Sequence, residues 1–161
     1  MSTLAFCKKP ATNLYLDAAA QAAAWIRSSE VRGPDGVSWP SVPSDPKEPT
    51  LDLYSGVPGV VLFFLQAFHS TGDMSFLADA RGGADYLLTK TPGVRGPGLY
   101  EGLSGIAFAL EETYKAAKEE KYRRGFVDCL ERIRANASPA GSGVEWSSTT
   151  DIISGGAGTG L

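Results

Sequence analysis

The sequence has few of the residues on which metal sites and disulfide frameworks depend. Its 161 residues include two cysteines, Cys7 and Cys129, and one histidine, His69. The cysteines form no Cys-x-x-Cys pair and neither precedes a histidine, so the sequence offers no zinc site of its own. We expect Cys7 to lie in a terminal tail, Cys129 to be a small buried hydrophobe on a helix face, and His69 to end a helix.

Long apolar runs and an excess of basic residues are also lacking. There is no run of 18 apolar residues, which argues against a membrane span, and the N-terminus lacks the apolar centre of a signal peptide. The formal net charge of −3 gives no support to nucleic-acid or anionic-membrane binding. We therefore expect a cytoplasmic protein, one domain over residues 1–161 with a loose tail at 1–11, and neither nucleic acid nor membrane as partner.

The residues of the glycine-rich C-terminal segment do not match either common nucleotide-binding loop. A dinucleotide loop that uses Gly156 and Gly158 would need glycine at position 161, where Leu161 stands. A Walker loop would need a lysine after its glycines, and none follows these.

The sequence does contain an internal repeat. Three segments each carry two apolar residues, a serine or glutamate, and then G-x-x-G: Asp52–Gly59, Gly98–Gly105 and Asp151–Gly158. Gly102 follows Gly56 by 46 residues and Gly155 follows Gly102 by 53 residues. Such spacing accommodates two helices and their turns, and a period of this kind is typical of helical repeat proteins.

The segments between the copies have helical periodicity. Residues 60–68 are apolar nearly all round, as in a helix buried on every side, and a second apolar segment begins at Ile106. Three further segments have one apolar face each. Their faces are Leu77, Ala80, Ala84 and Leu87; Tyr122, Phe126, Cys129 and Ile133; and Tyr15, Ala19, Ala22 and Ile26. We predict an all-α protein in which outer and inner helices alternate, with little or no sheet.

Paired glycines suit the first turn of a helix that a neighbour approaches closely. Residues three apart share a face, so each pair reduces that face to backbone. We expect Gly56, Gly59, Gly102, Gly105, Gly155 and Gly158 to mark helix starts that line a cavity, or else to permit close helix packing only. Ser55 and Ser154 are predicted to cap the helices that follow them. Two loops, Gly36–Trp39 and Gly143–Trp146, also match each other.

These motifs resemble those of the lanthionine synthetase C-like family. The segments "DLYSGVPGVVLFFL", "GLYEGLSGIAFALEETY" and "DIISGGAGTGL", with the G-x-x-W loops, carry a resemblance that extends from about Ala18 to Leu161. It implies an α/α toroid, of which this chain would be a truncated, partial one of about two and a half helical hairpins.

The resemblance also implies a reaction, in which a zinc-bound cysteine thiolate of a peptide adds to a dehydroamino acid. The family's zinc ligands, two cysteines and a histidine, belong to later repeats, so we expect no metal in this chain and zinc in the full-length parent. Asp151 matches an aspartate near the family's active cavity, where it would orient or relay a proton; a helix-capping role is the alternative. Asp52 holds the same place in the first copy and is expected to be structural.

Two other kinds of protein remain open. One is a carbohydrate-active α/α-toroid enzyme, for which Trp39, Trp146, Glu145 and Glu101 could supply aromatic platforms and acids. The other is a non-catalytic peptide-binding toroid. In each case we expect the open apolar flanks of a partial ring to be covered by a missing C-terminal half or by self-association.

Overall fold

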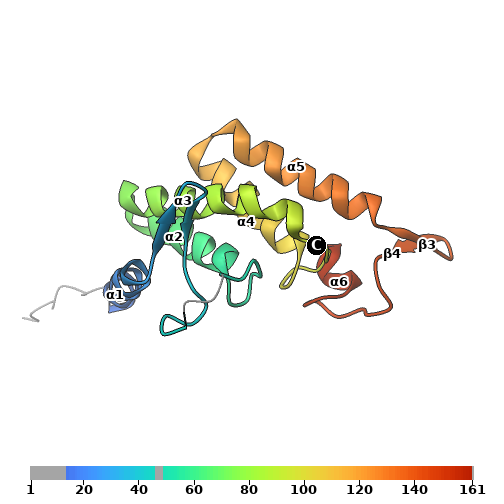
Figure 1. Cartoon of the computed structure of the whole chain (residues 1–161), viewed down its shortest axis with the longest axis horizontal. Helices are drawn as coiled ribbons and strands as arrows, with labels where there is room; N and C mark the ends of the chain where they lie inside the picture. Colours follow the sequence, from blue (N-terminus) through green and yellow to red (C-terminus); the bar gives the residue numbers. More distant parts are fainter. Residues whose placement is uncertain (1–13, 46–48, 161) are drawn as a thin grey trace, which may run out of the picture.

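The structure, a computed structural model, is mostly helical. It describes residues 14–45 and 49–160. Its helices are α1 Leu14–Ser28, α2 Val57–Thr71, α3 Met74–Lys90, the 3₁₀ turn η1 Thr91–Gly93, α4 Leu103–Ala117, α5 Glu120–Ala135 and the single turn α6 Gly156–Thr159. Figure 1 shows α1 at one end of the molecule and the hairpin at residues 138–145 at the other. The predicted tail at 1–11, and Cys7 within it, lie outside the described residues.

The helices are paired as the repeat predicts. α2 packs against α3 and α4 against α5, and α4 also lies beside both α2 and α3 (Figure 1). We call α2, α4 and α6 the motif helices, because a glycine motif opens each of them. A shift of 46 residues carries the bounds of α2 onto those of α4. Gly72 and Lys118, both in the left-handed conformation, end these two helices at the same point of the repeat.

Most predicted helix faces are confirmed, and one is partly wrong. Leu77, Ala80, Ala84 and Leu87 are all buried on α3, as are Tyr122, Cys129 and Ile133 on α5. On α1 the predicted face is right at Ala19 and Ile26, which are half-buried, but Tyr15 and Ala22 are exposed and Ala23 is the buried residue. The segment is so rich in alanine that two overlapping faces have nearly the same spacing, and the pattern does not distinguish them.

The helix α2 is less enclosed than its all-round apolar sequence predicts. Val61 and Phe64 are fully buried, but Phe63 and Ala67 line a small apolar pocket beside α1. One flank of α2 therefore stays open.

Each of the two G-x-x-W segments provides the second strand of a small β-hairpin. β1 Val31–Gly33 pairs with β2 Gly36–Ser38, and β3 Ser138–Ala140 pairs with β4 Gly143–Glu145, both antiparallel. These four strands are the sheet content of the described residues, in line with the expectation of little sheet. Strands of three residues are too short to give a period-2 signal.

The core lies between α2, α3, α4 and the buried face of α5, and it includes the first hairpin. Trp39, which follows β2, is buried and packs against Phe64 of α2, with ring centroids 5.5 Å apart. At the edge of this core, Arg27 of α1 donates to the buried carboxylate of Asp79 on α3 at 2.7 Å. None of the described helices is both long and apolar enough to cross a membrane.

The α4–α5 pair has a buried side and a partly exposed side, and leucine-to-alanine substitutions on each side test this difference in burial. Leu110 of α4 is fully buried, whereas Leu130 of α5 is 44% exposed. We expect Leu110→Ala to lower the free energy of unfolding by about 2–5 kcal/mol, because it leaves a cavity in a packed core. Leu130→Ala should cost less than about 1 kcal/mol, since little is lost at a half-exposed site. Urea unfolding measures both, and equal losses would contradict the described packing.

Candidate functional site

Each glycine motif begins a helix in the same way. The first glycine of the pair is the N-cap residue: Gly56 for α2, Gly102 for α4 and Gly155 for α6. The second glycine follows three residues later, in the first turn. The prediction that these motifs start helices is confirmed at all three positions.

The N-termini of the motif helices are capped by backbone carbonyls, not by side chains. The amide of Val57 donates to the carbonyl oxygen of Thr50 at 3.0 Å. The equivalent bonds join Leu103 to Gly96 at 2.8 Å and Gly156 to Thr149 at 3.0 Å. Each acceptor lies seven residues before its donor, so the loop before each helix folds back over the helix start.

Glycine is needed at the N-cap because the capping carbonyl lies so close. A methyl group at Gly56 would collide with the carbonyl oxygen of Thr50, and one at Gly102 with that of Gly96. At Gly155 it would come within 2.7 Å of the Thr149 oxygen. These are contacts with backbone atoms, which cannot move aside as a flexible side chain can.

The second glycines make room for the loop of their own repeat and for the repeat before it. Methyl groups at Gly59, Gly105 and Gly158 would collide with the carbonyl oxygens of Leu53, Leu99 and Ile152, respectively. At Gly105 the methyl would also lie 3.1 Å from Cβ of Leu53, and at Gly158 it would lie 3.1 Å from Cβ of Leu99. The same contact thus joins the first repeat to the second and the second to the third.

Backbone hydrogen bonds also connect the three loops. The amide of Leu53 donates to the carbonyl of Tyr100 at 2.7 Å, and the amide of Tyr100 donates to that of Ile153 at 2.9 Å. Gly98 holds the position that is aspartate in the other copies, and a methyl group there would lie 2.7 Å from Cα of Ser154. The starts of the three motif helices are therefore neighbours, held in register by main-chain contacts.

The two aspartates of the motifs order their own loops. Asp52 accepts from the amide of Ser55 at 2.6 Å, and Asp151 accepts from the amides of Ile153 at 2.7 Å and Ser154 at 2.9 Å. Hydrogen bonds from the backbone amides of Ser154 and Ile153 lower the pKa of Asp151 below its ordinary value. Burial acts to raise the pKa of Asp52, but the bonds from Ser55 and Thr50 outweigh it and the pKa is lowered.

The predicted capping role of Ser55 and Ser154 is wrong. Each serine precedes the N-cap glycine by one residue, and no side chain caps α2 or α6. The serine hydroxyls instead donate to Asp52 and Asp151. Because the N-cap residue is a glycine and has no side chain, the loop carbonyl accepts the hydrogen bond from the first amide of the helix.

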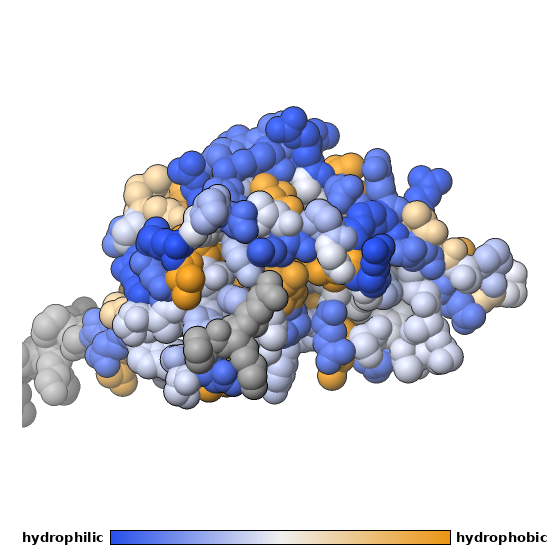
Figure 2. Space-filling view, viewed as in Figure 1, coloured by the Kyte–Doolittle hydropathy of each residue, from blue (hydrophilic) through white to orange (hydrophobic). Residues whose placement is uncertain are grey.

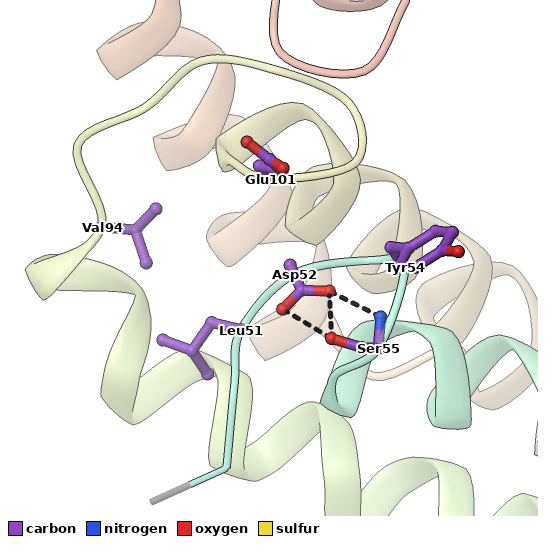
Figure 3. Close-up of a pocket in the computed structure, with 6 residues that line it drawn as sticks. All are labelled: Leu51, Asp52, Tyr54, Ser55, Val94 and Glu101. Atoms are coloured by element: carbon purple, nitrogen blue, oxygen red, sulfur yellow. Dashed lines mark hydrogen bonds between the residues drawn. The ribbon is translucent and has the colours of Figure 1, made fainter. Parts of the chain in front are cut away.

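An open pocket of about 420 Å³ lies between the first two helix starts. Leu51, Asp52, Tyr54 and Ser55 of the first loop line one side, and Val94 and Glu101 of the second loop line the other (Figure 3). Asp52 and Glu101 therefore come from neighbouring repeats to one pocket. Asp151 does not line this pocket, and of the six motif glycines Gly158 lines a different one, between α4 and α5.

The pocket itself was not predicted as a unit from the sequence. Glu101 and Asp52 occupy different positions in their motifs, so the repeat pattern gives no reason to pair them. The signal that could have found the pair is the adjacency of successive helix starts, which the repeat does predict.

Comparison with known families agrees with this geometry. The family model described as lanthionine synthetase C-like protein matches residues 47–161, the part of the chain that contains all three motifs. The chain belongs to the lanthionine synthetase C-like family. No curated protein matches the chain.

The family is one in which zinc is expected, and the described residues of this member do not fit a zinc site. Among residues 14–45 and 49–160, no three His, Cys, Asp or Glu side chains are grouped as metal ligands. His69 lies in the last turn of α2, and Cys129 is buried on α5. Burial raises the pKa of the Cys129 thiol to about 11, which opposes the thiolate form that binds metal.

The close approach at the second glycine provides a test of this lanthionine synthetase C-like arrangement. Gly105→Ala should lower the free energy of unfolding by about 1–3 kcal/mol, because the added methyl group collides with the Leu99 carbonyl. Gly33→Ala is the matched control, since nothing lies within 4 Å of a methyl group there. Thermal unfolding followed by circular dichroism compares the two, and a harmless Gly105→Ala would contradict the backbone contact.

Proposed function

We propose that this chain forms the N-terminal repeats of a lanthionine synthetase C-like enzyme with an α/α-toroid fold. The supporting observation is the side-by-side arrangement of three successive helix starts, joined by the same contacts from one repeat to the next. Helices whose N-termini lie side by side in this way would form one wall of a central cavity. Further repeats would supply the remaining wall.

The proposed reaction of the complete enzyme is addition of a peptide cysteine thiol to a dehydroalanine or dehydrobutyrine, which forms a thioether. Zinc would supply an activated thiolate, but its ligands would come from other repeats, and no step assigned to this chain passes through the metal. The part of this chain is to bind and orient the peptide at the starts of α2, α4 and α6. On its own it is proposed to be inactive.

The partners proposed for the chain follow from this assignment. A peptide would be the substrate, bound in the cytoplasm. The open flanks beside α2 and beside α4 and α5 would be covered by a missing C-terminal half of the protein, or by self-association in its absence. Neither nucleic acid nor a membrane is proposed as a partner.

One observation favours a non-catalytic peptide-binding role instead. Both carboxylate oxygens of Asp151 accept hydrogen bonds within their own loop, as those of Asp52 do. A carboxylate whose hydrogen bonds all come from its own loop orders that loop, a role that requires no reacting group.

Substitutions of Asp151 and Asp52 distinguish the catalytic proposal from the non-catalytic one. In the complete zinc-containing protein, Asp151→Asn should reduce the kcat of thioether formation by about 10²-fold or more, as expected for loss of a residue that moves a proton. Asp52→Asn, which removes a carboxylate with similar local hydrogen bonds two repeats earlier, should leave kcat near the parent value. Zinc content should be unchanged in both variants.

Equal and small effects of the two substitutions would make Asp151 a loop-ordering residue and would remove it from the catalytic proposal. A complete protein that binds the peptide and zinc but forms no thioether would support the non-catalytic role.

A further inference from the structure

A pocket beside the loop that precedes α4 is lined by two arginines. Its volume is about 350 Å³, and its lining consists of Arg95 from that loop and Arg132, Ala135 and Asn136 at the end of α5. Among the described residues, no carboxylate contributes to this lining. In a chain whose formal net charge is −3, the pocket is a local concentration of positive charge. We call it the arginine pocket.

The main chain holds Arg132 in position. Its Nη1 donates to the carbonyl of Thr91 at 2.9 Å, and its Nη2 donates to the carbonyl of Val94 at 2.5 Å. The side chain is mostly buried, and Nη1 lies 3.9 Å from the carboxylate of Asp128, which is itself exposed. These bonds fix the orientation of the guanidinium, which has further N–H groups to offer a ligand.

Arg95 differs from other cations of this region in having no acidic partner. Its side chain is exposed and, within the described part of the chain, makes no hydrogen bond or ion pair. By contrast, Lys121 and Arg123 each lie 2.6 Å from a carboxylate, those of Asp85 and Glu120. The surface over α5 is mostly hydrophilic (Figure 2), so Arg95 is distinguished from these cations by its missing partner and not by its exposure.

The same place in the first repeat is also hollowed. Its pocket, of about 460 Å³, includes the residues that precede Arg95, Arg132 and Asn136 by 46 positions: Pro49, Tyr86 and Lys90. There the cation is paired, because Nζ of Lys90 lies 3.3 Å from the carboxylate of Asp35 in the turn of the first hairpin. Residues 91–102, which precede α4, contain no β-hairpin, so the second repeat has no hairpin carboxylate in this place.

The arginine pocket adjoins the pocket that Asp52 and Glu101 line. Val94 lines the acidic pocket, and Arg95, the next residue, lines the arginine pocket. Two pockets of opposite charge therefore share one segment of the loop before α4. A peptide that binds along this segment can reach both of them.

We infer that Arg95 and Arg132 bind the carboxylate of an aspartate or glutamate side chain in the substrate peptide. A guanidinium presents paired N–H groups that match the two oxygens of a carboxylate, and the side-chain amide of Asn136 is a further donor. The inference rests on the proposed function, which makes a peptide the substrate. A phosphate group would meet the same donors, so the experiment compares the two anions.

NMR of the 161-residue chain tests the arginine pocket directly. The Nε–Hε signals of Arg95 and Arg132 should shift and saturate on titration with the tripeptide N-acetyl-Ala-Glu-Ala-amide. The matched tripeptide with glutamine in place of glutamate should bind about 10-fold or more weakly, because it lacks the charge that strengthens these hydrogen bonds. Inorganic phosphate is titrated in parallel.

Arg95→Gln is the informative variant, since its guanidinium has no partner in the described structure whereas Arg132 also holds two carbonyls. It should weaken binding of the glutamate tripeptide by about 10-fold or more. Arg124→Gln, which makes the same change of charge at an exposed position of α5 outside the pocket, should bind like the parent.

Three results would overturn the inference. They are equal binding of the glutamate and glutamine tripeptides, undiminished binding by Arg95→Gln, and binding of inorganic phosphate without binding of the glutamate tripeptide. The proposed function fails in a different way. In that case the 161-residue chain still binds the glutamate tripeptide, but the complete zinc-containing protein forms no thioether.

Discussion

The structure depends on one repeated main-chain contact: the first amide of each motif helix donates to a loop carbonyl seven residues earlier. The contact occurs at Val57, Leu103 and Gly156 with nearly equal lengths. It satisfies a helix-terminal donor without a side chain, and it folds each loop over its own helix start. The N-cap glycine follows from it, because any Cβ would occupy the place of the carbonyl. The loops in turn bond to one another, so the same constraint sets the positions of neighbouring repeats.

This arrangement determines which side chains near the helix starts are available to bind a ligand. Their aspartates are held in fixed orientations by loop amides, and these bonds favour the ionised carboxylate. Side chains that point away from the loops, such as Glu101 and Tyr54, remain available to a ligand in the pocket between the first two repeats. The main chain therefore provides the position of this pocket, and Glu101 and Tyr54 contribute side chains that line it.

Much of the helical framework could be predicted from the sequence, because the period of apolar residues on α3 and α5 reflects burial directly. The glycine motifs also predicted their helix starts. The means of capping could not be predicted, since a backbone acceptor leaves no signature at Ser55 or Ser154. The face of α1 could not be predicted either, because alanine at most positions fits more than one face. The pocket lined by Asp52 and Glu101 depends on the approach of two loops, which no local pattern encodes.

Amide hydrogen exchange at the helix starts tests the central claim most directly. By NMR, the amides of Val57 and Leu103 should exchange much more slowly than expected for the first residue of a helix, which ordinarily has no intrahelical acceptor. The amides of Leu53 and Tyr100, which join neighbouring loops, should be protected as well. Exchange of these four amides at the rate of an unstructured chain, with the interiors of α2 and α4 still protected, would contradict the account.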